Sequence, residues 1–236
     1  MPDILFENGA VLVMNKPGGL LTQGPPGIDS LELRTKQFLK IREQKPGKVY
    51  LGVPHRLDRP VSGAIVVVKN VRAAKRLSEQ FRVRTVTKTY WSIVEGELNQ
   101  DSGSWNDWMR KVPDEAKSEI VPSDHPEAKS AVLHFRVLMR AKGLTLVEIE
   151  LQTGRTHQIR LQFGSRSWPI VGDALYGSNE RFGPETNDIR KRWIALHARR
   201  LAFVHPISKE PVDQTAPVPD CWQGFDDFAP ILFPGL

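Results

Sequence analysis

The sequence predicts an α+β fold built around a mainly antiparallel sheet. Apolar runs of strand length outnumber segments with helical spacing, and several of these runs follow one another without an intervening helix. The chain has 236 residues, of which 40% are hydrophobic and 25% charged, so it can bury a sizeable core. We therefore expect one domain over residues 1–236, with no separate domain before Ile4.

The first half of the chain predicts two strands and two helices. Strands are expected at residues 11–14, before the turn residues at 15–19, and at residues 64–68. One helix should begin at Asp29 or Ser30 and run to about Glu43, and a second should begin at the cap residue Asn70. The apolar residues expected on their buried faces are Leu31, Phe38 and Ile41 in the first helix, and Val71, Ala74, Leu77 and Phe81 in the second.

The second half predicts mostly strands. Residues 99–128 are polar and predict a long functional or variable loop with short strands. The C-terminal tail is rich in proline. Residues 153–164 are typical of a turn that leads into a short helix, which Gly164 would end in the left-handed conformation. The main strands are expected at residues 89–94, 131–138, 144–151 and 195–204.

Several protein classes are excluded. No stretch approaches about 18 apolar residues, which a membrane-spanning helix needs, and the first residues lack the pattern of a secretion signal. A single cysteine, Cys221, cannot form an internal disulfide and fits a reducing compartment. The six histidines show no metal-ligand spacing, so we expect no metal. These features predict a cytoplasmic protein with no membrane partner.

The positive charge is clustered. The formal net charge is +6, residues 151–172 contain no acid, and the predicted helix near residues 72–88 carries Arg76 and Arg82 among six bases. Such clusters are typical of proteins that bind a polyanion such as nucleic acid, but they are equally typical of a solvated helix face.

One carboxylate has an unusual setting. Asp58 lies between Arg56 and Arg59, in a segment stiffened by Pro54 and Pro60 and followed by an apolar strand. Flanking cations favour the ionised carboxylate, and a stiff turn fixes its direction, which suits nucleophilic attack or stabilisation of a cationic centre. The alternative is a turn aspartate in a surface ion pair.

Two further side chains could act with Asp58. Arg160, on the predicted short helix, could reach a carboxylate elsewhere in the fold, although that helix could also simply cover the sheet. Tyr90, at the start of a strand, is of a type that usually packs in the core, but its ring could instead stack on a nucleobase.

At this point the residues resemble a known family. The segment His55–Gly63, with the sequence HRLDRPVSG, is similar to the signature of the RluA/RluD-type pseudouridine synthases. Further stretches match that family in the expected order, over roughly residues 4–218. They are Asn15–Leu20, Lys88–Tyr90, Thr153–Arg160, Pro169–Asp173, Leu175–Gly177, His197–Ala198 and His205–Pro206.

The resemblance implies an enzyme that isomerises uridine to pseudouridine in RNA without a cofactor or a metal. It implies a twisted, mainly antiparallel mixed sheet flanked by helices and loops, with the active site in a central cleft. By analogy Asp58 is the catalytic aspartate, Tyr90 stacks on the target base and helps to remove the C5 proton, and Arg160 pairs with the aspartate. Arg56 fills the gap that the flipped nucleotide leaves, and His55 helps to shape the loop.

The remaining expectations concern RNA. We assign His55, Arg56, Arg155, His157, Arg76 and Arg82 to RNA contacts and expect a monomer that acts on rRNA or tRNA. Val61 replaces a threonine that is common in the signature, and the small N-terminal RNA-binding domain of many relatives is not expected here. Two other functions stay open: a non-catalytic RNA-binding protein or chaperone on the same scaffold, and a hydrolase that releases the base.

Overall fold

The computed structural model describes residues 2–234, which form two compact units. Within these residues, the first unit comprises 2–88, Thr186–Arg192 and Ala198–Pro219, and the second comprises Thr89–Glu185, Trp193–His197 and 220–234. Both units are built on mainly antiparallel strands with few helices, so the predicted α+β class is confirmed. The expectation of one catalytic domain with a central cleft stays a prediction.

The first unit is built on a sheet whose strand order is β1-β2-β3-β9, with β10 paired to β9. Strand β3 is buried at every residue, and its valines meet those of β2 in one apolar core. The strands are β1 (Ile4–Asn8), β2 (Val11–Lys16), β3 (Ser62–Val68), β9 (Leu196–Val204), whose first two residues belong to the second unit, and β10 (Pro211–Thr215).

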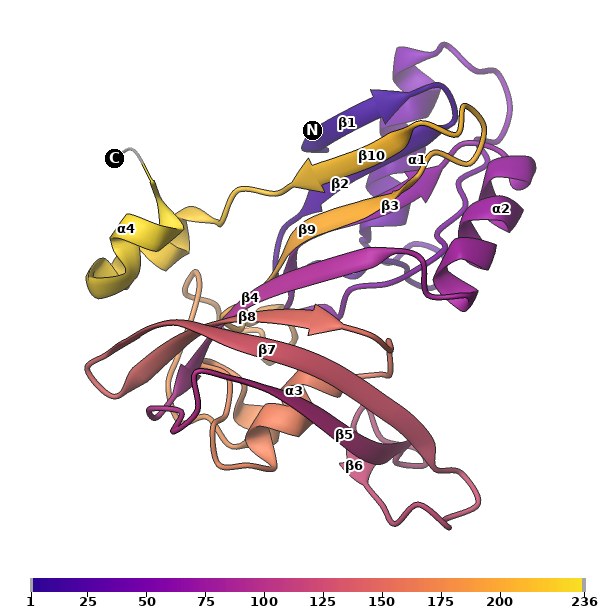
Figure 1. Ribbon diagram of the computed structural model, residues 1–236. Helices are drawn as coiled ribbons and strands as arrows, with labels where there is room; N and C mark the ends of the chain where they lie inside the picture. Colours follow the sequence, from indigo (N-terminus) through magenta and orange to yellow (C-terminus); the bar gives the residue numbers. More distant parts are fainter. Residues whose placement is uncertain (1, 235–236) are drawn as a thin grey trace. The chain divides into compact units, whose positions relative to one another are not determined.

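Two capped helices pack beside these strands (Figure 1). Helix α1 (Leu31–Arg42) begins after Ser30 and α2 (Val71–Arg82) begins after Asn70. In each case the cap side chain accepts a hydrogen bond from the backbone N–H three residues on, as the sequence predicts. A short 3₁₀ helix, η2 (Ile189–Lys191), completes the helical elements of this unit.

The predicted buried face needs correction in α1, and at one residue in α2. In α1 the buried residues are Leu31, Thr35 and Leu39, whereas Ile41 is 79% exposed. In α2 the predicted Leu77 is buried and the predicted Ala74 and Phe81 pack against the core, whereas Val71 is 52% exposed and Ala73 is buried instead. Apolar spacing alone missed the buried face of α1, because Thr35 donates its hydroxyl proton to the Leu31 carbonyl oxygen and can therefore be buried.

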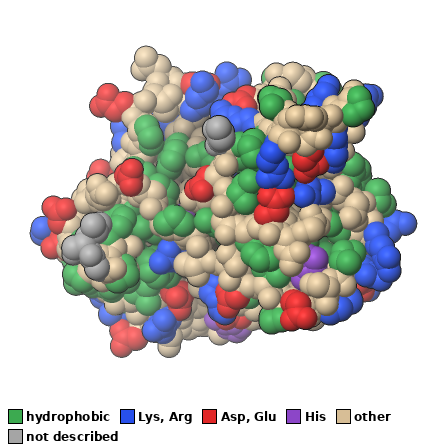
Figure 2. Space-filling model, turned by 90° about the horizontal axis from the view of Figure 1, so that it is seen from above, with side chains coloured by type: hydrophobic (Ala, Val, Ile, Leu, Met, Phe, Trp, Pro, Cys, Tyr) green, Lys and Arg blue, Asp and Glu red, His purple; other side chains and the backbone are tan. Residues whose placement is uncertain are grey.

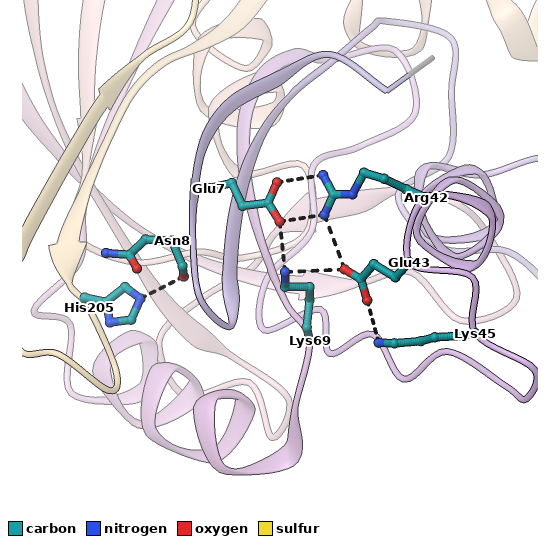
Figure 3. Close-up of polar contacts among 7 residues, drawn as sticks. All are labelled: Glu7, Asn8, Arg42, Glu43, Lys45, Lys69 and His205. Atoms are coloured by element: carbon teal, nitrogen blue, oxygen red, sulfur yellow. Dashed lines mark hydrogen bonds and ion pairs between the residues drawn. The ribbon is translucent and has the colours of Figure 1, made fainter.

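Ion pairs join the ends of the first unit's elements (Figure 3). Glu7 of β1 accepts hydrogen bonds from Arg42 at the end of α1 and from Lys69 just after β3. The hydrogen bonds from Arg42 lower the pKa of Glu7 to about 2. His205 binds the backbone oxygen of Asn8 and fixes the turn between β9 and β10 to the β1–β2 turn.

The second unit has the strand order β4-β8-β7-β5-β6, and each neighbouring pair in this order is antiparallel. Met109, Ala131 and Leu161 form one core cluster, which brings helix α3 onto the sheet. The strands are β4 (Thr87–Glu95), β5 (Ser102–Lys111), β6 (Ser118–Ile120), β7 (Lys129–Ala141) and β8 (Leu144–Leu151), and the helices are α3 (Gln158–Gly164), η1 (Ala174–Tyr176), η3 (Asp220–Gly224), η4 (Asp226–Phe228) and α4 (Ala229–Leu232).

Gly164 does not have the role expected for it. It is the last helical residue of α3 rather than a left-handed terminator. A Cβ atom at Gly164 would lie 2.6 Å from the backbone oxygen of Tyr176. The glycine is therefore required by the close approach of η1.

The surface carries charges of both signs. Figure 2 shows one face of the molecule, on which Lys and Arg side chains stand among Asp and Glu side chains and apolar ones. None of the helices within residues 2–234 is long and apolar enough to cross a membrane.

Candidate active site

The three predicted catalytic residues are divided between the two units. Asp58 belongs to the first unit, and Tyr90 and Arg160 belong to the second.

The segment that carries Asp58 is a turn braced from both sides. The Val61 N–H donates to the Asp58 backbone oxygen over 3.1 Å and closes the turn. Leu57, the residue before Asp58, is buried. Its N–H donates to the Thr22 hydroxyl over 3.2 Å, and its carbonyl oxygen accepts from the same hydroxyl over 2.8 Å. Arg59 Nε donates to the Gly19 oxygen over 3.2 Å. The half-buried Asp58 thus stands on backbone that is fixed to the loop at residues 19–22.

Lys16, at the end of β2, supports the same turn from inside the unit. Its ammonium group is fully buried and donates to the backbone oxygens of Pro17, Leu20 and Arg59 over 2.9, 2.7 and 3.3 Å. Burial lowers the pKa of Lys16 to about 7, although the nearby Asp58 carboxylate favours the charged form. The three acceptors match the three protons of the ammonium ion.

His55 is held by β3 and α2. Its Nε2 accepts a hydrogen bond from the Val66 N–H over 3.0 Å, and its ring stacks on Phe81 with the centroids 4.5 Å apart. Burial lowers the pKa of His55 to about 3, so the ring is neutral at physiological pH. The loop is thus attached to β3 and α2 through His55, while the neighbouring Arg56 is exposed.

In the second unit Tyr90 lies on β4 and is almost completely buried, at 9% exposure. Its register partner on β8 is Ile149. The same strand is fixed farther along, because the N–H of Val171 donates to the Ile93 oxygen over 3.0 Å. This bond attaches the segment that leads to Asp173 to β4.

Arg160 of α3 forms a buried ion pair with Asp173. Its Nε and Nη2 donate to the two carboxylate oxygens over 2.6 and 2.8 Å, and the side chains are 7% and 1% exposed. The guanidinium carbon also lies 5.2 Å from the centre of the Tyr176 ring. A bidentate pair at this depth fixes the guanidinium plane.

The residues assigned to RNA contacts are placed as follows. His157 adopts the left-handed conformation, with φ 55°, just before α3, and its Nδ1 lies 2.9 Å from the Tyr176 hydroxyl. Arg155 donates to the Ser130 oxygen. In α2, Arg76 donates to the Pro206 oxygen, and the exposed Arg82 pairs with Glu79.

Sequence reasoning gave no role to Lys16, Asp173 or Tyr176. All three lie within stretches that carry the family resemblance. The available signal was that these residues lie in the stretches that resemble the family. Burial of a lysine or an aspartate has a high desolvation cost, so each needs polar partners in the fold. The partner of each could be found only from the fold.

Comparison with known proteins agrees with the resemblance. The family model for RNA pseudouridylate synthase matches residues 10–165, which is more than half of the chain. The chain belongs to the RNA pseudouridylate synthase family. The matched range includes the braced turn, β4 and all of α3.

Several individual synthases are similar to the chain. An uncharacterized RNA pseudouridine synthase of Synechocystis is 35% identical over 92% of this chain and 65% of its own length. The ribosomal large subunit pseudouridine synthase D of Xanthomonas campestris is 34% identical, over 92% of this chain and 66% of its own length. The chain therefore spans about two thirds of the length of these relatives.

The fold is also that of this family. The structure of human RNA pseudouridylate synthase domain containing 4 superposes with a TM-score of 0.75 and 23% identity, over 98% of this chain and 92% of the human one. The predicted fold family is thereby confirmed.

Proposed function

We propose that this protein isomerises uridine to pseudouridine in RNA and that Asp58 is its catalytic residue. Family membership supports the reaction class. The observation that carries the assignment of Asp58 is the braced turn, in which Leu57, Arg59 and Val61 are each hydrogen-bonded and hold the backbone on both sides of the aspartate. A carboxylate on rigid backbone is preorganised for attack at a fixed point.

The reaction exchanges one bond of the nucleoside for another. The bond between C1′ and N1 breaks, the base turns, and C1′ bonds to C5. The C5 proton then leaves, and N1, which carried no proton in uridine, gains one, so that the product has the same composition as the substrate. The Asp58 carboxylate acts at the sugar, either by attacking C1′ or by supporting a route through deprotonation of the sugar.

Tyr90 and Arg160 complete the proposed catalytic set. The Tyr90 ring would stack on the base, and its hydroxyl would assist the loss of the C5 proton. The positive charge of Arg160 would act on the Asp58 carboxylate. The buried bond of Arg160 to Asp173 supports such a role, because it fixes the direction of the guanidinium.

The proposed substrate is a uridine in structured rRNA or tRNA. The name of the Xanthomonas relative refers to the ribosomal large subunit, which favours rRNA. A uridine must leave its helical stack before C1′ can be reached, which costs a few kcal/mol. The exposed Arg56 would fill the gap, while Arg155, His157, Arg76 and Arg82 would bind the surrounding RNA.

One assay tests this proposal. RNA labelled with tritium at uridine C5 is incubated with the protein, and both label in water and free uracil are measured. Pseudouridine formation releases the label to water without free uracil. Release of uracil would instead show a hydrolase, and RNA binding without either product would show a non-catalytic binding protein.

A further inference from the structure

A pocket of about 440 Å³ lies in the second unit, and its lining includes none of the residues of the proposed catalytic set. It is bordered by the start of β5, by β7 and by the segment that follows α3. We call it the aromatic pocket. Its walls include Asn99, Gln100, Trp105, Phe135, Arg166 and Trp168.

Two indole rings form its walls. Trp105 and Trp168 are nearly parallel, with an angle of 5° between their planes and 6.2 Å between their centroids. Phe135 supports Trp105 from the side, with a centroid separation of 4.6 Å. Both indoles are only half-buried, so ring surface remains open to a ligand. Aromatic faces of this kind bind planar groups by stacking.

A guanidinium group extends this platform. The Arg166 guanidinium carbon lies 4.4 Å from the centre of the Trp105 ring. Arg166 is held there by Asp107, whose carboxylate is 3.0 Å away, and by the backbone oxygen of Gln162, also at 3.0 Å. Because the guanidinium is already ordered, a ligand that stacks beside it would bind without the loss of conformational entropy that immobilising a free side chain costs.

The rim of the pocket is polar. Asn99 and Gln100 are exposed, and each side-chain amide offers both hydrogen-bond donors and an acceptor. The backbone beneath them is fixed, because Arg140 donates to the oxygens of Leu98 and Gln100 over 2.8 and 3.1 Å. A planar ligand stacked on the indoles would therefore meet mixed polar groups at its edge, as the edge of a nucleobase requires.

We propose that the aromatic pocket binds an unstacked nucleobase of the substrate RNA, distinct from the target uridine. The proposal rests on the proposed function, which supplies RNA as the ligand. An apolar protein side chain would gain nothing from a stacked guanidinium and an amide rim, whereas a base uses both. The pocket volume lies in the range of small-ligand sites.

Cross-linking to the wild-type protein tests the proposal without any substitution. A single-stranded RNA containing 4-thiouridine is bound to the protein and irradiated, and the attached residues are found by mass spectrometry. We expect cross-links at Trp105, Phe135 or Trp168. Cross-links that fall only outside the aromatic pocket would overturn the inference.

Binding measurements give the second test. Trp168→Ala should weaken binding of the same RNA at least about fivefold, since one base stack is removed, while Trp168→Phe should retain most of the affinity. Trp108→Ala is the control, because Trp108 is a tryptophan of β5, as Trp105 is, but it is 38% exposed and does not line the pocket. Equal losses in Trp108→Ala and Trp168→Ala would contradict the proposal, and thermal unfolding checks that each variant is folded.

Turnover separates this inference from the proposed function. In tritium release, Trp168→Ala should raise KM and leave kcat unchanged, because the pocket acts only in binding. If the wild-type protein released no tritium, the proposed function would fail, yet the cross-links would still decide where RNA bases bind. If the wild type were active and Trp168→Ala had an unchanged KM, the inference alone would fail.

Discussion

A neutral histidine links the loop that carries Asp58 to the strand that follows it. His55 accepts the hydrogen bond of the buried Val66 N–H, and its folded-state pKa is about 3. In the unfolded chain the imidazole has an ordinary pKa of about 6.5. Between these values the unfolded chain binds a proton that the folded protein does not, so acid must reduce the free energy of unfolding through His55.

His55→Phe keeps a ring against Phe81 but removes the acceptor of the Val66 N–H. At pH 7.5 this variant should be less stable than the wild type by about 1–3 kcal/mol. The difference should shrink by about 2 kcal/mol at pH 5, because only the wild type loses stability as acid protonates its unfolded state. Urea unfolding at the two pH values measures it, and a difference that is the same at both would show that His55 is not held neutral.

Tyr90→Phe tests the hydroxyl of the second predicted catalytic residue. The ring is almost fully buried, so phenylalanine should preserve both the fold and the stacking surface. Turnover should fall by about 10²-fold or more if the hydroxyl assists proton loss from C5. Pseudouridine formation is the measurement, with RNA affinity as the control, and full activity would remove the hydroxyl from the mechanism.

At the scale of single residues, the sequence predicted the candidate residues but not the contacts that hold them in place. Asp58 stood out through its flanking arginines and prolines. The support from Lys16 comes from the end of another strand, and it acts on backbone oxygens, which leave no mark in the sequence. Tertiary contacts of this kind follow from the fold alone.

At the scale of elements, one buried ion pair joins α3 to the segment that ends at Asp173. Asp173→Asn removes the negative charge beside Arg160 in a site with almost no solvent. The variant should lose about 3 kcal/mol or more of stability, because the buried guanidinium loses the carboxylate that binds it through two hydrogen bonds. Thermal unfolding measures the loss.

The double variant Arg160→Met, Asp173→Leu is the control for this prediction. It removes both charges and should recover a large part of the stability, although not the activity. If Asp173→Asn were as stable as the wild type, the ion pair would not hold the helix in place.

The elements themselves were largely predictable, because strand runs and helix caps are local signals. The caps Ser30 and Asn70 are where the sequence predicts them. The buried face of α1 was not predicted correctly, since Thr35 is buried and Ile41 is exposed. Strand β10 was also missed, because it lies in a segment that reads as an irregular tail and is ordered by pairing with β9.

At the scale of the whole molecule, a net charge of +6 favours binding to RNA. Arg76→Glu combined with Arg82→Glu should weaken RNA binding and reduce the slope of log K against log salt by about 0.7 for each phosphate that the variant no longer neutralises. The comparison is Lys45→Glu with Arg190→Glu, which makes the same charge change at exposed positions outside the assigned set. Equal effects of the two pairs would assign the binding to net charge rather than to α2.

The central claim is that the Asp58 carboxylate performs the isomerisation. Asp58→Asn keeps the size of the side chain and removes its charge. Under single-turnover conditions, this variant should form pseudouridine at least about 10³-fold more slowly than the wild type, while its RNA affinity and unfolding temperature stay the same. Pseudouridine formation by Asp58→Asn at the wild-type rate would contradict the account.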